Sequence, residues 1–177
     1  MVICQGFLTL IVKNETISLK YMNNKILSDV IGETPDVIFC GLAPDKESLM
    51  MQHYYANPHD KFWRVLHQFH FTDKQIKTSL DPLERQENYE YLISKNIGLC
   101  DNFDELISKV KELKPKVLAF NGKKAAELYL NRAVEYGELK KDKIGKTRVY
   151  VLPSTAGSAN ANWNIRYWRE LKTIIKK

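Results

Sequence analysis

The sequence predicts an α/β protein: a three-layer α/β/α sandwich around a short, mostly parallel four-stranded sheet. Short β-branched apolar runs alternate with helix-like segments, which is typical of a parallel sheet covered on both faces. The 177 residues can bury a substantial core, and no repeat or low-complexity linker divides them. We therefore expect a single domain over residues 25–177, preceded by an appendage of unknown role at residues 1–24.

The strands are predicted from short apolar runs bounded by residues that interrupt strands. They cover residues 36–40, 96–100, 116–120 and 147–152. The first run lies between Pro35 and Gly41, and the third follows Pro115 and ends at an Asn-Gly turn. Ligands of such folds bind beyond the carboxyl ends of the strands, so we expect the site in the loops that follow these runs.

Helices are expected over residues 62–71, 82–93, 104–113, 123–130 and 163–176. The first and third of these segments carry apolar residues at helical spacing. Asp60 stands just before the first helix, and Asp81 with Pro82 opens the second, which are typical signals of a helix N-terminus. The segment after Gly41 is rich in Pro, Asn, His and Tyr and is interpreted as a long loop.

Composition excludes several classes of protein. Hydrophobic residues make up 44% and charged residues 27%, which argues against a disordered or fibrous chain. Apolar runs are much shorter than the roughly 20 residues that cross a bilayer. The first twelve residues lack the basic start and cleavage site of a secretory signal. We expect a cytoplasmic protein without membrane partners, associated with the nucleoid if the cell is prokaryotic.

The cysteines and the charge carry weaker information. Cys4, Cys40 and Cys100 lie far apart, so we expect buried thiols in a reducing compartment. The formal net charge is +6, and the pI is near 9.1. A basic surface attracts phosphate polyanions, which makes nucleic acid the leading class of partner.

Three motifs, each at or after the end of a predicted strand, point to a family. They are Gly-Leu-Ala-Pro-Asp at residues 41–45, Tyr-Tyr-Ala-Asn-Pro-His-Asp-Lys-Phe-Trp at 54–63, and Val-Leu-Pro-Ser-Thr-Ala-Gly-Ser-Ala-Asn at 151–160. Together they resemble the uracil-DNA glycosylase superfamily, most closely its mismatch-specific uracil/thymine and hypoxanthine-DNA glycosylase branches. The resemblance runs from about Pro35 to the C-terminus, with the turn at residues 120–122 in register.

The resemblance implies that a flipped base lies against the turn formed by Gly41, Leu42 and Ala43. Relatives often supply a polar group to the attacking water at the position of Ala43, which has none. Cleavage passes through an oxocarbenium-like sugar, which an anion stabilises. Asp60 is the first candidate, because the hypoxanthine branch has an Asn at the matching place; its alternative role is a helix cap, and the two are compatible. Asp45 is the second candidate, and its alternative is a solvated turn residue.

No cofactor is expected. The Gly-Leu-Ala-Pro motif is similar to that of an iron–sulfur branch, but the cysteine set of that branch is absent. His67 and His70 are three residues apart without an evident third ligand, so no metal is expected. No lysine is placed for Schiff-base chemistry, which favours plain hydrolysis.

Further residues are predicted to line the base pocket. The resemblance implies that Tyr55 stacks on the extruded base, the alternative being a core aromatic. Asn57 either bonds the base or braces its own loop. Asp101 follows the second strand and, when ionised, can only accept hydrogen bonds from a base; its alternative is to cap the next helix.

Two loops are predicted to contact DNA. Asn121 precedes a helix, a position that suits a phosphate, although a simple turn is the alternative. The fourth strand is followed by small polar residues that could hold phosphates or enter the gap left by a flipped base. These are Ser154, Thr155, Gly157, Ser158 and Asn160. A plain surface loop is the alternative.

These features predict a monomeric, monofunctional DNA glycosylase of base excision repair. It would flip a deaminated or mismatched base (uracil, hypoxanthine or similar) and hydrolyse its N-glycosidic bond. One rival is a non-catalytic binder of damaged or single-stranded nucleic acid, which Ala43 favours. A weaker rival is an α/β enzyme that binds nucleotides; its affinity would depend little on salt, unlike that of a DNA-binding protein.

Overall fold

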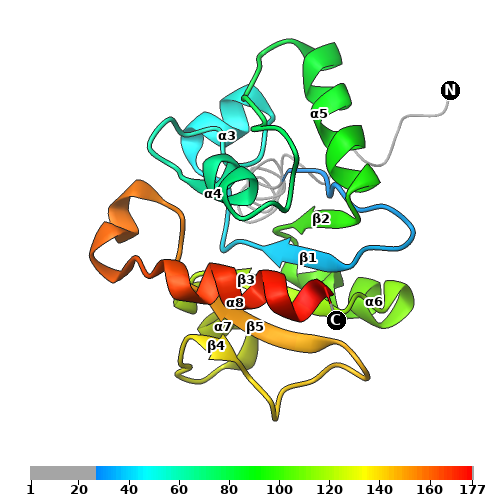
Figure 1. Cartoon of the computed structure of the whole chain (residues 1–177), viewed down its shortest axis with the longest axis vertical. Coiled ribbons are helices and arrows are strands. Elements are labelled where there is room, and N and C mark those ends of the chain that lie inside the picture. Colours follow the sequence, from blue (N-terminus) through cyan, green and yellow to red (C-terminus); the bar gives the residue numbers. More distant parts are fainter. Residues whose placement is uncertain (1–26, 177) are drawn as a thin grey trace, which may run out of the picture.

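A five-stranded sheet forms the centre of the computed structural model, which describes residues 27–176 (Figure 1). Its order is β2 (Ile97–Cys100), β1 (Val37–Cys40), β3 (Val117–Asn121), β5 (Arg148–Leu152) and β4 (Gly137–Glu138). The first four strands are parallel, as predicted, and β4 pairs antiparallel with β5. The expectation of four strands was wrong, because two residues are too short for a pattern of alternation. The predicted appendage at residues 1–24 lies outside the described residues.

The five predicted helices all form. They are α4 (Phe62–Gln68), α5 (Pro82–Ser94), α6 (Phe103–Leu113), α7 (Lys123–Leu130) and α8 (Ile165–Lys176). Helix α4 ends three residues earlier than expected, and His70 has a left-handed φ of 57°. Two elements were missed, α3 (Lys46–Met51) and the 3₁₀ helix η1 (Gly157–Asn162). None of the helices in the described part is long and apolar enough to cross a membrane.

The helices cover both faces of the sheet, which confirms the three layers. One face packs against α4, α5 and α8, and the other packs against α6 and α7. Because successive strand residues point to opposite faces, Phe39 belongs to the first core and Cys40 to the second. Cys40 and Cys100 are fully buried free thiols, as predicted; Cys4 lies outside the described residues.

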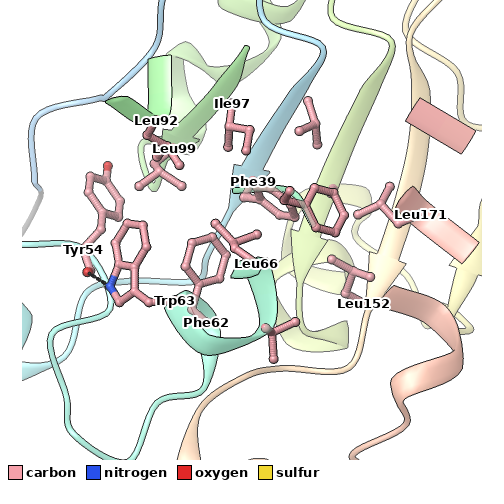
Figure 2. Packing of buried hydrophobic residues seen from close by; sticks show 14 of the residues in the cluster. Phe39, Tyr54, Phe62, Trp63, Leu66, Leu92, Ile97, Leu99, Leu152 and Leu171 are labelled. Carbon is pink, nitrogen blue, oxygen red and sulfur yellow. Dashed lines mark hydrogen bonds between the residues drawn. The ribbon is translucent and has the colours of Figure 1, made fainter. Parts of the chain in front are cut away.

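Aromatic rings form the centre of the first core (Figure 2). The ring of Phe39 meets that of Phe62 edge-on at 5.3 Å between centroids and stacks on that of Trp168 at 5.7 Å. Trp63 is also buried, and its Nε1 donates to the carbonyl oxygen of Tyr54 at 3.0 Å. Phe62 is the first residue of α4, so this core fixes where the helix begins and where the preceding loop must end.

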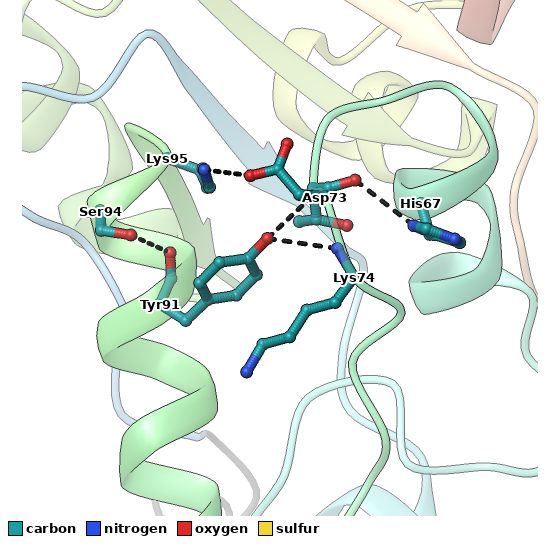
Figure 3. A network of polar contacts seen from close by, with 7 residues as sticks. His67, Asp73, Lys74, Tyr91, Ser94 and Lys95 are labelled. Carbon is teal, nitrogen blue, oxygen red and sulfur yellow. Dashed lines mark hydrogen bonds and ion pairs between the residues drawn. The ribbon is translucent and has the colours of Figure 1, made fainter.

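Tyr91 of α5 binds the backbone of the loop between α4 and α5 (Figure 3). The hydroxyl of Tyr91 accepts hydrogen bonds from the backbone N–H groups of Asp73 at 2.8 Å and Lys74 at 3.3 Å. Lys95 forms an ion pair with the Asp73 carboxylate, and this pair lowers the pKa of Asp73. Asp81 caps α5 through the N–H of Leu83, as its position before Pro82 predicted.

Candidate active site

A cavity of about 570 Å³ opens at the carboxyl ends of the parallel strands, the edge where the fold predicted a site. Each of the four parallel strands contributes a residue at or just after its end: Gly41 after β1, Asp101 after β2, Asn121 in β3 and Ser154 after β5. Ten of the predicted residues line it: Gly41, Leu42, Ala43, Asp45, Tyr55, Asp60, Asp101, Asn121, Ser154 and Ser158. Four do not: Asn57, Thr155, Gly157 and Asn160.

Gly41 and Asp101 form one wall of the cavity. The N–H of Gly41 donates to Oδ1 of Asp101 at 2.9 Å. A Cβ atom on residue 41 would lie 2.7 Å from that oxygen, so only glycine allows this approach. Burial raises the pKa of Asp101 to about 6, and the Gly41 N–H opposes the rise. The carboxylate thus accepts a hydrogen bond from its own chain.

Helix α6 is capped by Asn102 and not by Asp101, which corrects the alternative role given to Asp101. The side-chain oxygen of Asn102 accepts from the N–H of Asp104 at 3.2 Å. Asp101 and Asn102 both fit the sequence signal for an N-cap, and only the direction of each side chain in the structure distinguishes them. Asp101 is thereby left to face the cavity.

Replacement of Asn102 by alanine should therefore lower the free energy of unfolding by about 1 kcal/mol, the usual effect of losing an N-cap. Urea unfolding at neutral pH measures the change. Asn102→Asp is the matched control, because a carboxylate also caps a helix and should keep the stability close to that of the unmodified chain. Equal stability of the alanine and aspartate variants would contradict this assignment of the cap.

Asp60 lies on the cavity and also bonds the start of α4. Its Oδ1 accepts from the N–H of Phe62 at 2.8 Å, while the N-cap residue itself, Lys61, offers no side-chain bond. Burial raises the pKa of Asp60, and hydrogen bonding from Thr155 and from the Phe62 N–H opposes that rise. The two roles predicted for Asp60 are thus compatible in geometry, because a helix cap uses only part of its acceptor capacity.

Asp45 is the second carboxylate at the cavity. It is exposed and caps α3 by accepting from the N–H of Ser48 at 2.7 Å. Its negative charge contributes to raising the pKa of Asp60. Between Gly41 and Asp45, Ala43 is exposed at the cavity and brings no polar side chain there.

Tyr55 has an unusual backbone and a buried hydroxyl. Its φ of 52° is uncommon for a residue other than glycine. One face of its ring stacks on Phe62 at 3.8 Å between centroids, so at most the other face is open to a base. The Tyr55 hydroxyl has no hydrogen-bond partner of normal geometry among residues 27–176. Burial raises its pKa, and the nearby Asp101 adds to the rise, so the hydroxyl keeps its proton.

Asn57 braces the loop that carries Asp60. Its Oδ1 accepts from the N–H of His59 at 2.9 Å, and its carbonyl oxygen accepts from the N–H of Asp60 at 2.9 Å. Both bonds are internal to the turn. The geometry therefore corresponds to the bracing alternative, with the side chain outside the cavity lining.

The loop after β5 packs directly against this turn. The carbonyl oxygen of Thr155 accepts from the N–H of Lys61 at 3.0 Å, and Asn160 accepts from the Lys61 ammonium. A Cβ on Gly157 would lie 2.9 Å from the Cβ of His59, so this contact also needs glycine. Thr155 has no exposed surface, whereas Ser158 and Asn160 are exposed. Of the five loop residues, Thr155 is thus the least able to touch DNA itself.

Several residues of the cavity were missed from the sequence. They include Ser48, Tyr54, Lys123, Lys124 and Tyr136. Ser48 lies in a helix that was interpreted as loop, although Asp45 three residues earlier is a recognisable cap signal. The two lysines were counted only as net charge; Lys123 is paired with Glu135 at 2.9 Å, and Lys124 is exposed.

No group of three or more His, Cys, Asp or Glu side chains in residues 27–176 is arranged to hold a metal ion. His53, the most buried histidine of the described residues, donates from Nδ1 to the carbonyl oxygen of Tyr54, and its ring contacts those of Trp63 and Tyr89. Burial lowers its pKa, which favours the neutral form. No histidine of the described residues lines the cavity. The ionisable groups that face it are carboxyl, tyrosine and lysine side chains.

Comparison with known proteins agrees with this geometry. The model of the uracil DNA glycosylase superfamily matches residues 29–172. The fold is similar to that of a solution NMR structure from Methanosarcina acetivorans, a protein provisionally named a uracil DNA glycosylase, with a TM-score of 0.62 and 22% identity. That similarity covers 87% of this chain and 99% of the other. The resemblance carried by the three motifs is thus confirmed, and the chain belongs to the uracil DNA glycosylase superfamily.

Proposed function

We propose that the protein is a DNA glycosylase that hydrolyses the N-glycosidic bond of a deaminated or mismatched base turned out of the DNA. The observation that carries this proposal is the half-buried Asp60 carboxylate, which is hydrogen-bonded through the Phe62 N–H and borders a cavity of about 570 Å³. Membership of the superfamily supports the general activity. The base and the roles of the individual residues are part of the proposal.

In the proposed mechanism, Asp60 acts on both the water and the sugar. The C1′–N bond breaks with its electron pair going to the base, which takes a proton from solvent. Ionised Asp60 stabilises the cationic sugar and holds a water whose oxygen attacks C1′. The proton of that water passes to Asp60 and then to solvent. Ala43 cannot take this role, because a methyl group neither orients water nor bears charge.

The proposed base site lies between Gly41, Asp101 and Tyr55. Asp101 retains an oxygen that the Gly41 N–H does not use, and an ionised carboxylate accepts from a ring N–H. The Tyr55 hydroxyl has no hydrogen-bond partner of normal geometry among residues 27–176, and it can donate to a neighbouring carbonyl of the base. Bases that carry N–H beside C=O, such as uracil and hypoxanthine, match this pair.

The proposed DNA contacts come from the exposed rim. Ser158 and Asn160 on η1 and the ammonium of Lys124 can reach phosphates beside the cavity. Extrusion of a base costs a few kcal/mol, and least when the base is mispaired, which by itself favours damaged sites. The formal net charge of +6 favours approach to DNA.

The test is incubation with labelled oligonucleotides that carry uracil, hypoxanthine, xanthine or a thymine mismatch, in single- and double-stranded form, followed by alkali. We expect strand breaks at one or more of these bases. We also expect binding that weakens steeply as salt rises, because phosphate contacts release counterions. Unmodified oligonucleotides of the same sequence are the control and should stay intact.

Ala43 favours a second candidate, a binder of damaged nucleic acid that does not cleave. It places no polar side chain where many relatives are expected to orient water. Salt-sensitive binding together with intact strands across the whole panel would support this candidate against the glycosylase. Binding of free nucleotides with little salt dependence would contradict both.

A further inference from the structure

Asn121 and Thr155 bond each other twice, although they come from different strand ends. The side-chain N–H of Asn121 donates to Oγ1 of Thr155 at 2.8 Å, and the backbone N–H of Thr155 donates to Oδ1 of Asn121 at 3.0 Å. Asn121 is 8% exposed and Thr155 is 0% exposed. Both ends of the Asn121 amide are therefore engaged, and its orientation is fixed.

This pair determines where the Thr155 hydroxyl proton goes. Because Oγ1 already accepts from Asn121, its own O–H is left to donate, and we infer that it donates to the Asp60 carboxylate. The carbonyl oxygen of Thr155 also accepts from the N–H of Lys61 at 3.0 Å, and this bond anchors Thr155 beside the segment that carries Asp60. Main chain and side chain of one threonine thus hold the segment that carries the carboxylate.

We propose that Thr155, aligned by Asn121, is a positioning residue that keeps the Asp60 carboxylate ionised and directed at the cavity. The inference rests on the proposed function in that the reaction uses Asp60. A hydroxyl that accepts one hydrogen bond becomes a stronger donor in the next. The chain of hydrogen bonds from the Asn121 amide through the Thr155 hydroxyl to the carboxylate therefore stabilises negative charge more than an isolated hydroxyl would. This role replaces the direct DNA contact that the sequence suggested for Thr155.

Electrostatics agree with this geometry. Burial raises the pKa of Asp60, and Asp45 adds to the rise. Hydrogen bonding from Thr155 is the first of the effects that oppose it, followed by the Phe62 N–H. Without the hydroxyl, the pKa of Asp60 should therefore rise further above its ordinary value.

Thr155→Val tests the role, because valine keeps the shape and removes the hydroxyl. Base release should be measured from about pH 5 to about pH 9. We expect the valine variant to lose roughly tenfold in rate near pH 6 and less above pH 8, because its Asp60 ionises at higher pH. Thr155→Ser retains a hydroxyl and should keep the pH profile of the unmodified chain. An equal loss at every pH would overturn the proposal in favour of simple packing.

A titration without DNA separates this inference from the proposed function. The carboxyl carbon of Asp60 is followed by NMR against pH in the unmodified chain, Thr155→Val and Thr155→Ser, with the signal assigned by its absence in Asp60→Ala. A higher pKa of Asp60 in the valine variant alone supports the positioning role. The same pKa in all three proteins overturns it. If the unmodified chain releases no base from any oligonucleotide, the proposed function fails, while this titration still decides the role of Thr155.

Discussion

Asp60→Ala is expected to lower the rate of base release by about 10²–10⁴-fold, the usual contribution of a general base. The change removes both the charge that faces the cationic sugar and the acceptor that holds water. The fold loses the bond from the Phe62 N–H, at 2.8 Å, and the one inferred from the Thr155 hydroxyl, and both lie beside the cavity, so oligonucleotide binding should persist. Single-turnover release from the best oligonucleotide of the panel measures the rate, and a gel-shift assay measures binding.

Asp45→Ala is the matched control, because it removes the other carboxylate at the cavity. It should lower the free energy of unfolding by about 1 kcal/mol through the loss of the α3 cap, with base release within about tenfold of the unmodified chain. The reverse pattern, with Asp45→Ala inactive and Asp60→Ala active, would transfer the catalytic role to Asp45. Asp60→Asn keeps an acceptor without a charge. Its rate of base release should lie between those of Asp60→Ala and the unmodified chain, and the rate should no longer fall at acid pH.

Asp101→Asn is expected to make the protein more stable at neutral and alkaline pH, by about 3 kcal/mol. Burial raises the pKa of Asp101 from 3.8 to about 6, and each pKa unit corresponds to about 1.36 kcal/mol. Between these two values the folded chain binds more protons than the unfolded chain, so stability falls as pH rises through the interval. Asparagine does not ionise, and its Oδ1 can still accept from the Gly41 N–H.

Urea unfolding at a series of pH values from about 3 to about 8 measures this effect. The unmodified chain should lose stability between about pH 4 and about pH 6 relative to the variant, whereas the two should differ little below that interval. Asp104→Asn, which replaces an exposed carboxylate in the first turn of α6, is the surface control. Identical pH dependence in Asp101→Asn and the unmodified chain would assign the effect to another group.

Much of this fold follows from local sequence signals. The four parallel strands and five helices were predictable, because the spacing of apolar residues, the helix-capping residues and the prolines determine local structure within a few residues. Strand β4 was not, since Gly137 and Glu138 acquire strand character only by pairing with β5. Helix α3 was obscured by the Pro, His and Tyr residues that follow it.

The site was predictable in its location and less so in its roles. The motifs and the ends of the predicted strands placed Asp60, Asp101 and the turn at Gly41 at one edge of the sheet, and they do line one cavity. The cap of α6 differed from expectation by a single residue, because adjacent Asp and Asn carry the same local signal. The burial of Thr155 could not be predicted, because its partner Asn121 is 34 residues away and belongs to another strand.

Phe62 links the packing of the first core to the position of the proposed catalytic carboxylate. Its ring belongs to the aromatic core, where it meets Phe39, while its backbone N–H holds the Asp60 carboxylate. A lineage that adapts to cold by loosening this core would therefore displace its own proposed catalytic group, and one that adapts to heat by repacking it would meet the same constraint. Temperature adaptation in close relatives should accordingly concentrate on the second core, around α6 and α7, and leave Phe62 unchanged.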